Sequence, residues 1–458
     1  MLLVACSDGA PTSVDQAEPT VQAAPASAQL GTFGVSLENM DTTVAPGENF
    51  FEFVNGTWLA NTEIPADRSR FGAFNVLSDR AEERVRTIIE AAASSENPSA
   101  DEKRIADYYN AYMDVDAIEA AGLSPIQADL DRIRAAETHD DVLDLMSDAA
   151  LGLSAPVSLS VYIDAKNNDE HRVYMSQFGL GLPNRDSYFD EGDRADEIRA
   201  GYVNYVATML REAGVVDAEA RAQDVMAFET ALAEEFWGPV KQRNRDLTYN
   251  KMSLDALAEA APGIPWARMF DNLGLGGESE VILREKSAIE AAAAVFADTP
   301  VTVLSDYLTV SLLGNNASYL PARIDDASFE FFGKTLRGQE EQRPRWKRAV
   351  GQVNGTLGMV VGKVYVAEHF PPASKAQMDT LVENLRASVK DGIDNLEWMG
   401  EETKEQAQYK LAKFNPKIGY PDVWETYEGL EIDRDDLYGT VKSSRQWSWD
   451  DEVGDLGG

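Results

Sequence analysis

The sequence is poor in three things on which common functions depend: cysteine, basic charge and long apolar runs. Cys6 is the only cysteine in 458 residues, so no internal disulfide can form. The 41 basic residues face 78 acidic ones, and the net charge of −37 argues against nucleic acid as a partner. No stretch reaches the roughly 18 consecutive apolar residues of a membrane-spanning helix.

Histidine is also scarce, which bears on metal chemistry. A zinc peptidase of the HExxH type needs two histidines one helical turn apart with a glutamate between them. His139, His171 and His369 lie far apart, and no such pair exists in the 458 residues. Separate histidines are usually buried with a partner or exposed, so the sequence predicts no metal ligand and no catalytic residue in this chain. Phosphate-binding, dinucleotide-binding and serine-hydrolase motifs are absent as well.

The first residues predict a lipid anchor. Leu3-Val4-Ala5-Cys6 resembles a bacterial lipobox, in which small residues precede a cysteine whose thiol carries an acyl chain. The alternative is a chance cysteine near the start. A signal peptide also needs a basic segment and a longer apolar stretch. Both are missing, so residues 1–6 are interpreted as a truncated lipoprotein signal with its true N-terminus upstream.

Residues 7–31 predict a disordered tether, because they are rich in Ala, Pro, Ser and acid and have no apolar periodicity. A tether after a lipid anchor would hold a globular body away from a membrane surface. Ser7, rather than an aspartate, follows the cysteine, which favours the outer membrane. The expected location is the bacterial cell envelope, facing the periplasm or the exterior.

From Phe33 onward the periodicity predicts a mainly α fold, a multi-helical lobe with one small β-hairpin. The clearest helix covers 376–399, where apolar residues recur at spacings of three and four before Gly400. The β-rich runs 157–163 and 172–178 predict a hairpin at about 157–178, with its turn at Asn167-Asn168-Asp169. Four aromatic residues near the start are expected in the core: Phe50, Phe51, Trp58 and Phe74.

Several segments, in this order, resemble the N-terminal part of the neprilysin and endothelin-converting-enzyme family of zinc metallopeptidases, in its bacterial branch. Together they cover roughly residues 33–458, and the agreement of five segments in order is far more specific than any one of them. The segments are FFEFVNGTWLANTEIPADRSRFGAF (50–74), GLGLPNRDSYF (179–189), LTYNKMSLDAL (247–257), VYVAEHFPPASKAQM (364–378) and LEWMGEETKEQAQYKLAKFNPKIGYPDVW (396–424).

The resemblance implies the N-terminal part of a two-lobed, mainly helical peptidase that acts on short peptides with a zinc-bound water. The family's catalytic C-terminal lobe, which carries HExxH and the zinc ligands, is absent from these 458 residues. Residues 33–458 would then form the N-terminal helical domain, with 33–95 packing against the missing catalytic lobe. By itself this chain is expected to be inactive.

One family binding residue carries over to this sequence. The Ser-Arg-aromatic-Gly segment of the family matches Ser69-Arg70-Phe71-Gly72, and its arginine binds substrate on the primed side of the cleft. A guanidinium there can bind a peptide carbonyl or carboxylate. The next two polar family positions, an acid and an arginine, are here Asn75 and Ser78. Without the resemblance, Arg70 is equally a surface arginine paired with an acid.

Two functions therefore remain open from the sequence. The first is the N-terminal domain of a lipid-anchored zinc metalloendopeptidase that hydrolyses short peptides. The second is a complete, non-catalytic helical lipoprotein of the envelope that binds peptides or a protein partner. A downstream HExxH in the same reading frame would separate the two.

Overall fold

The computed structural model describes residues 36–457, which form two compact units. One unit combines residues 36–63 with Gly362–Trp424, and the other combines Ile64–Val361 with 425–457. Cys6 and the predicted segments 1–6 and 7–31 lie outside the described residues. The predicted lipidation and tether are therefore not tested by the structure.

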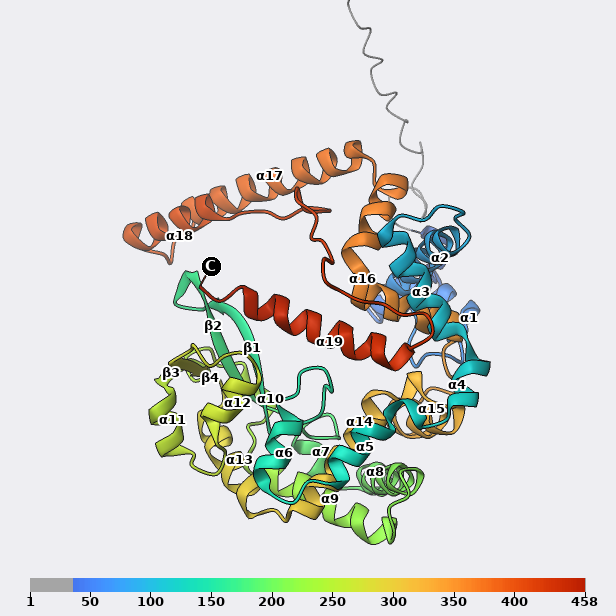
Figure 1. Ribbon diagram of the computed structural model, residues 1–458. Helices are drawn as coiled ribbons and strands as arrows, with labels where there is room; N and C mark the ends of the chain where they lie inside the picture. The colour runs from blue at the N-terminus through green and yellow to red at the C-terminus, as the bar shows by residue number, and fades with distance from the viewer. Residues whose placement is uncertain (1–35, 458) are drawn as a thin grey trace, which may run out of the picture. The chain divides into compact units, whose positions relative to one another are not determined.

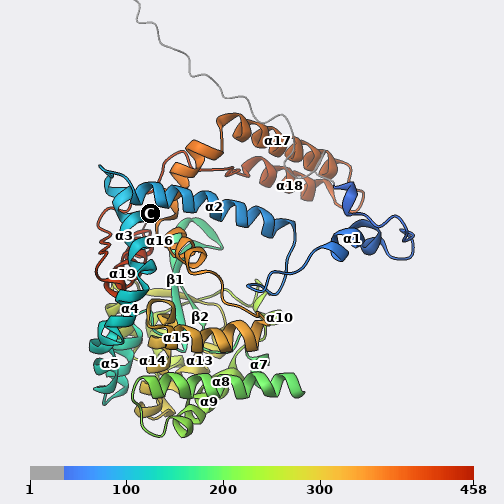
Figure 2. The ribbon, with the colours of Figure 1, turned by 90° about the vertical axis from the view of Figure 1, so that its right-hand side faces the viewer.

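The smaller unit is built around a helical pair. Its elements are a 3-10 turn at Leu37–Asn39, α1 (Phe50–Asn61), the end of α16 (Arg345–His369), α17 (Pro372–Asp394) and α18 (Glu401–Lys413). Helices α17 and α18 run side by side (Figures 1 and 2). They are joined by hydrogen bonds from Lys404 Nζ to the Asp394 carbonyl, 3.0 Å, and from Gln408 Nε2 to the Lys390 carbonyl, 3.0 Å. No residue of α17 is buried.

The larger unit holds the remaining helices and all strands of the described residues. The helices are α2 (Ala73–Ala93), α3 (Ala100–Met113), α4 (Val115–Ala121), α5 (Gln127–Arg134), α6 (His139–Met146), α7 (Asp186–Phe189), α8 (Asp193–Glu212), α9 (Ala218–Glu235), α10 (Pro239–Gln242), α11 (Leu254–Ala260), α12 (Trp266–Asn272), α13 (Lys286–Asp298), α14 (Val301–Asn315), α15 (Ala322–Ser328), the first part of α16 and α19 (Leu437–Gly454). Short helical turns cover Ser124–Ile126, Ala317–Tyr319 and Phe329–Thr335. The prediction of a mainly helical fold is confirmed.

The predicted hairpin is confirmed and belongs to a four-stranded sheet. Its strands are β1 (Val157–Asp164), β2 (Asn167–Gln177), β3 (Asn250–Ser253) and β4 (Glu280–Leu283), in the order β1-β2-β4-β3. Strands β1 and β2 are antiparallel, whereas β2 and β4 are parallel. The sequence did not predict β3 and β4, which have four residues each.

The predicted hairpin turn was wrong by a few residues. Asn167-Asn168-Asp169 belong to β2, and the turn is formed by Ala165 and Lys166. The cause is Asp164, whose carboxylate accepts a hydrogen bond from the Lys166 backbone N–H at 2.8 Å. An aspartate that satisfies the amide two residues later favours a tight turn at that point.

The core of the larger unit lies around α8, α9, α13 and α14. Leu304, Leu308 and Leu312 of α14 are fully buried, and α8 and α9 pack side by side below them (Figures 1 and 2). Among residues 36–457, no single helix has the length and hydropathy of a membrane span; α13 and α14 reach it only as a pair bent by 114°.

Helix α19 joins distant parts of the larger unit through polar contacts. Tyr438 Oη and Lys442 Nζ each lie 2.9 Å from a carboxylate oxygen of Asp129, a buried residue of α5. Glu452 accepts the backbone N–H of Val161 in β1 at 2.6 Å. Arg445 donates to the Leu151 carbonyl at 3.0 Å. Helix α19 therefore connects α5, β1 and the loop between α6 and β1.

The expectation that the N-terminal aromatics lie in the core was wrong for three of the four. Phe50, Phe51 and Phe74 are 67%, 63% and 88% exposed, and only Trp58 is partly buried. In α1 the one buried residue is Gly56, where Asp41 approaches so closely that a Cβ would meet its Cβ at 2.6 Å. Helix α1 is thus packed closely at Gly56, whereas Phe50 and Phe51 at its N-terminal end are exposed.

Candidate functional site

The loop before α2, which carries the sequence-predicted site, is held by backbone hydrogen bonds. The N–H groups of Glu340 and Glu341 both donate to the Ala66 carbonyl, at 3.1 and 3.0 Å. Gln339 Nε2 donates to the Asp67 carbonyl at 2.8 Å. The loop is therefore fixed to the segment that leads into α16, within the same unit.

A network of four charged side chains fixes the same loop more firmly. Arg68 contacts Asp79 at 2.8 Å and Asp67 at 3.2 Å, and Lys347 lies 3.5 Å from Asp79. The hydrogen bond to Asp79 raises the pKa of Arg68. Partial burial opposes ionisation of Asp79, but Arg68 and Lys347 outweigh it and lower the pKa of that carboxyl. The guanidinium of Arg68 and the carboxylate of Asp79 therefore both stay charged at neutral pH.

Arg70 lies two residues beyond this anchor and is exposed. Among residues 36–457 it makes no hydrogen bond or ion pair, so its guanidinium presents five N–H donors to solvent. Phe74, in the first turn of α2, is 88% exposed, and Ser78 is exposed one turn later. The anchored loop and the first turn of α2 thus each expose one such side chain, the guanidinium of Arg70 and the ring of Phe74. The predicted role of Arg70 in substrate binding stays a prediction.

The three histidines lie in separate elements and have separate surroundings. His139 Nε2 is 2.9 Å from the Thr299 carbonyl, and its ring packs edge-on against Phe296. His171 is on β2, and the ring of His369 lies edge-on to that of Tyr365 at the end of α16. Within the described part of the chain, no group of three or more His, Cys, Asp or Glu side chains is placed to hold a metal ion. The zinc that the resemblance implies therefore does not fit these residues.

A buried carboxylate that the sequence analysis missed holds the segment 179–189 in place. Glu229 of α9 is 2% exposed and accepts hydrogen bonds from Tyr188 Oη at 2.5 Å, Tyr202 Oη at 2.7 Å and the Gly181 N–H at 3.1 Å. Burial raises the pKa of Glu229 to about 7, against the effect of these donors. All of its contacts are to this chain's own groups, so its role is to position the segment.

Sequence contained a signal for this carboxylate. Residues 222, 225, 229 and 232 follow the spacing of one helix face, and Ala222, Val225 and Leu232 are all fully buried. A glutamate in the middle of such a face indicates a buried acid with partners. In the same segment Gly179 has a φ of +97°, a conformation that favours glycine, and its carbonyl accepts a hydrogen bond from Tyr307 Oη at 2.7 Å.

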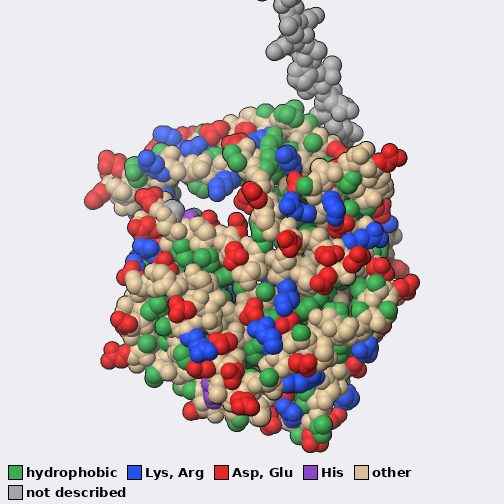
Figure 3. Space-filling model, in the orientation of Figure 1, with side chains coloured by type: hydrophobic (Ala, Val, Ile, Leu, Met, Phe, Trp, Pro, Cys, Tyr) green, Lys and Arg blue, Asp and Glu red, His purple; other side chains and the backbone are tan. Residues whose placement is uncertain are grey.

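The surface agrees with the acidic composition. On the face shown in Figure 3, carboxylate side chains are spread among basic ones, and the coloured residues of that face form no continuous basic stripe. Electrostatic binding of nucleic acid requires clustered basic side chains. This face therefore offers no electrostatic footprint for a nucleic acid.

Comparison with known proteins places this architecture in a family. The N-terminal model of peptidase family M13 matches residues 46–421. Human endothelin-converting enzyme 1 is 27% identical over 401 residues, covering 84% of this chain and 52% of the enzyme. Mouse membrane metallo-endopeptidase-like 1 is also 27% identical, over 415 residues, covering 84% of this chain and 54% of that protein. The chain thus spans about half the length of these curated relatives.

Solved structures agree with the family match. The crystal structure of the zinc metalloprotease ZMP1 of Mycobacterium tuberculosis with an inhibitor is 34% identical, with a TM-score of 0.88, covering 93% of this chain and 65% of that one. PepO of Lactobacillus rhamnosis is 21% identical, with a TM-score of 0.79. This match covers 90% of this chain and 66% of PepO, and it shows that the two share a fold. The family resemblance seen in the sequence is confirmed, and the chain belongs to peptidase family M13.

Proposed function

We propose that the complete protein is a zinc metalloendopeptidase that hydrolyses short peptides, and that the 458-residue chain supplies its N-terminal portion and is inactive alone. The observation that carries the proposal is the family match over residues 46–421. It is supported by the 34% identity to a mycobacterial zinc metalloprotease over 93% of the chain. Zinc would be held by residues beyond those described here.

Arg70 would contribute to substrate binding. A guanidinium with no partner among residues 36–457 can bind a carbonyl or carboxylate without first breaking an internal contact, and a fixed loop spares the cost of ordering its backbone. The network of Arg68, Asp79 and Lys347 provides that rigidity. Phe74 lies close by in sequence and would offer an apolar surface to a neighbouring substrate side chain. Asn75 and Ser78 add no charge, so Arg70 would act without a second cation.

Exposed apolar side chains support a further lobe in the complete protein. On α17, Leu381, Leu385 and Val389 are 50%, 57% and 50% exposed at helical spacing. Phe50 and Phe51 of α1 are exposed to a similar degree. Clustered exposed apolar residues mark surfaces that another protein part covers. In this proposal the catalytic lobe covers both, consistent with the predicted packing of residues 33–95.

The proposal also keeps the predicted location. Cys6 would carry the lipid, residues 7–31 would act as a tether, and the enzyme would stand in the bacterial envelope, at the outer membrane. Metabolic labelling with a radioactive fatty acid tests this directly. We expect label in the wild-type protein and none in Cys6→Ser, and equal labelling of both would contradict the anchor.

The activity is tested by reading the gene beyond codon 458 and expressing the longer product. We expect a downstream HExxH, and cleavage of short peptides that a chelator abolishes and zinc restores. The 458-residue chain assayed in parallel should cleave nothing. A stop codon directly after residue 458 would favour the alternative, a non-catalytic envelope lipoprotein. Chelator-sensitive cleavage by the 458-residue chain would contradict the predicted inactivity.

A further inference from the structure

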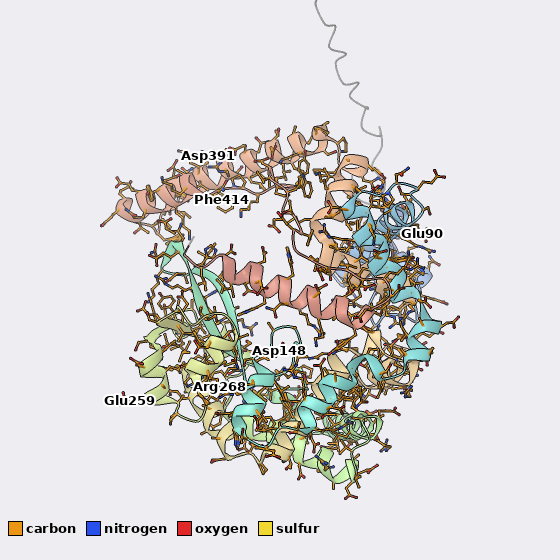
Figure 4. All side chains as sticks on the ribbon, in the orientation of Figure 1. Glu90, Asp148, Glu259, Arg268, Asp391 and Phe414 are labelled. Atoms are coloured by element: carbon orange, nitrogen blue, oxygen red, sulfur yellow. The ribbon has the colours of Figure 1, made fainter. Side chains whose placement is uncertain are left out.

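The larger unit contains a cavity of about 620 Å³ beside α19. Its volume is in the range of small-ligand sites. Three of its aromatic lining residues are Tyr427, Trp447 and Trp449. Asp148, on the loop after α6 near α19 in Figure 4, lines the same cavity.

The aromatic rings of the cavity are held in fixed orientations. The rings of Tyr427 and Trp447 lie 5.0 Å apart between centroids. The Trp447 indole N–H donates to the Glu428 carbonyl at 2.9 Å, and the Trp449 indole N–H donates to the Leu273 carbonyl at 2.8 Å. Tyr427 Oη accepts the Met359 backbone N–H at 3.1 Å. Because both indole donors are used, the indoles contribute π faces rather than donors to a ligand.

Charge in the cavity is unbalanced. Its lining includes four carboxylates, from Asp148, Glu425, Asp451 and Glu452, and one cation, Arg445. The guanidinium of Arg445 already donates to the carbonyls of Leu151 and Asn315. Asp148 pairs with Arg132, and Glu452 accepts the Val161 N–H.

Two of these carboxylates have no partner within the described part of the chain. Glu425 and Asp451 are both exposed and make no hydrogen bond or ion pair with any residue from 36 to 457. Asp451 follows Trp447 by four residues on α19, which places both on the same helix face. Burial raises the pKa of the Tyr427 phenol, and the charges of Glu425 and Asp451 act in the same direction. Both carboxylates line the same cavity as that ring.

We infer that this cavity binds a cationic side chain, an arginine or lysine of a peptide. The cation would contact the rings of Tyr427 and Trp447 together with the carboxylates of Glu425 and Asp451. A cation gains from aromatic faces and from unpaired carboxylates at once. An anion would be repelled by the four carboxylates. An apolar ligand would remove water from two charged carboxylates without giving them hydrogen bonds in return. A metal ion lacks ligands, since the described residues hold no group of three or more suitable side chains.

The inference that the cation belongs to a peptide rests on the proposed function. The inference that the cavity prefers a cation is independent of the proposed function. The test therefore uses binding to the 458-residue chain, which needs no catalysis. The probe is N-acetyl-Gly-Arg-Gly-amide, and the matched probe has neutral citrulline in place of arginine. Titration calorimetry gives the affinities, and fluorine NMR of 5-fluorotryptophan, with Trp447→Phe to assign the signal, gives the position.

We expect the arginine probe to bind at least tenfold more tightly than the citrulline probe and to shift the Trp447 signal. The double variant Glu425→Gln and Asp451→Asn should lower arginine affinity to the citrulline level. Glu259→Gln, an exposed acid on α11 away from the cavity (Figure 4), should leave it unchanged. If the double variant loses cooperative melting, Asp451→Asn alone supplies the comparison.

Equal affinity for the two probes, an unmoved Trp447 signal, or full arginine affinity in the double variant would overturn the inference. Failure of the peptidase proposal would look different. In that case the longer gene product would not cleave peptides, while arginine would still bind here.

Discussion

The hydroxyl of Tyr188 donates to Oε2 of Glu229 across 2.5 Å, and neither residue is more than 6% exposed. This bond joins the short helix α7 to the middle of α9. Because the carboxyl is surrounded by protein, its ionisation costs more than it would in water. The pair therefore couples the stability of the larger unit to pH.

Stability should fall as pH rises from about 4.5 to 7. In this window the folded protein keeps a proton on Glu229, whose pKa is about 7, while the unfolded chain, with the ordinary value of 4.5, has lost it. The raised pKa thus favours folding at low pH, and about 3 kcal/mol of that contribution is lost by pH 8. Urea unfolding of wild type and Glu229→Gln across this range isolates the residue.

The glutamine variant imitates the protonated acid, so the two proteins should have similar stability near pH 5. Near pH 8 the variant should be more stable by about 2–3 kcal/mol, because it has no charge to bury. A constant difference between the two proteins from pH 5 to 8 would show that Glu229 does not titrate there.

Removing the basic partner of a buried carboxylate should be costly. Arg221 contacts both carboxylate oxygens of Asp306 at 2.5 Å, and Asp306 is 3% exposed. Arg221→Ala leaves that carboxylate buried and unpaired, and should cost about 3–5 kcal/mol of unfolding free energy. Arg211→Ala removes an exposed pair with Glu219, also at 2.5 Å, and should cost under about 1 kcal/mol. Equal losses in denaturant titrations would refute the role of burial.

Arg70→Ala should weaken substrate binding and leave the stability of the chain almost unchanged. Arg70 is exposed and has no partner among residues 36–457, so the free energy of unfolding of this chain should change by less than about 0.5 kcal/mol. In the complete enzyme the variant should raise KM about tenfold to a hundredfold with little change in kcat. Peptides with a free carboxylate should be affected more than amidated ones if that group is the contact. Unchanged KM for both forms would remove Arg70 from the site.

The apolar face of α17 should matter only in the complete protein. Leu381→Ser with Leu385→Ser should shift the unfolding of the 458-residue chain by less than about 1 kcal/mol, since both residues are at least half exposed. In the longer product the same pair should lower the melting temperature, because the lobe that covers them loses apolar contact. Asn384→Ser on the same helix is the control. If the double variant lowered the melting temperature of the longer product no more than Asn384→Ser does, that result would argue against a covering lobe at α17.

The sequence predicted the helices and strands whose apolar residues recur at a regular spacing. It missed those that form only through contacts with residues remote in the sequence. Alternation in residues 157–178 was enough for the hairpin, and Ile105, Tyr108 and Tyr112 are buried on one face of α3 as their spacing indicates. Strand β4 has only four residues and pairs with both β2 and β3, which lie in other parts of the sequence, so no local pattern reports it.

The candidate site divides in the same way. Arg70 was reached through a motif, whereas the anchoring of its loop depends on Lys347, which is remote in sequence. Phe50 and Phe74 were expected in the core because aromatic residues are usually buried, yet they are exposed. Hydrophobicity alone does not tell whether the covering surface belongs to this chain or to another part of the protein.

The contacts of α19 have a consequence for synthesis. Tyr438 meets Asp129 across 309 residues of sequence, so the buried acid lacks this partner while the ribosome makes everything between them. At roughly 5–20 residues per second, that interval lasts about 15–60 s. Until α19 emerges, the carboxylate of Asp129 therefore lacks both Tyr438 and Lys442, and of its three side-chain partners only Arg132, three residues later on α5, is already present.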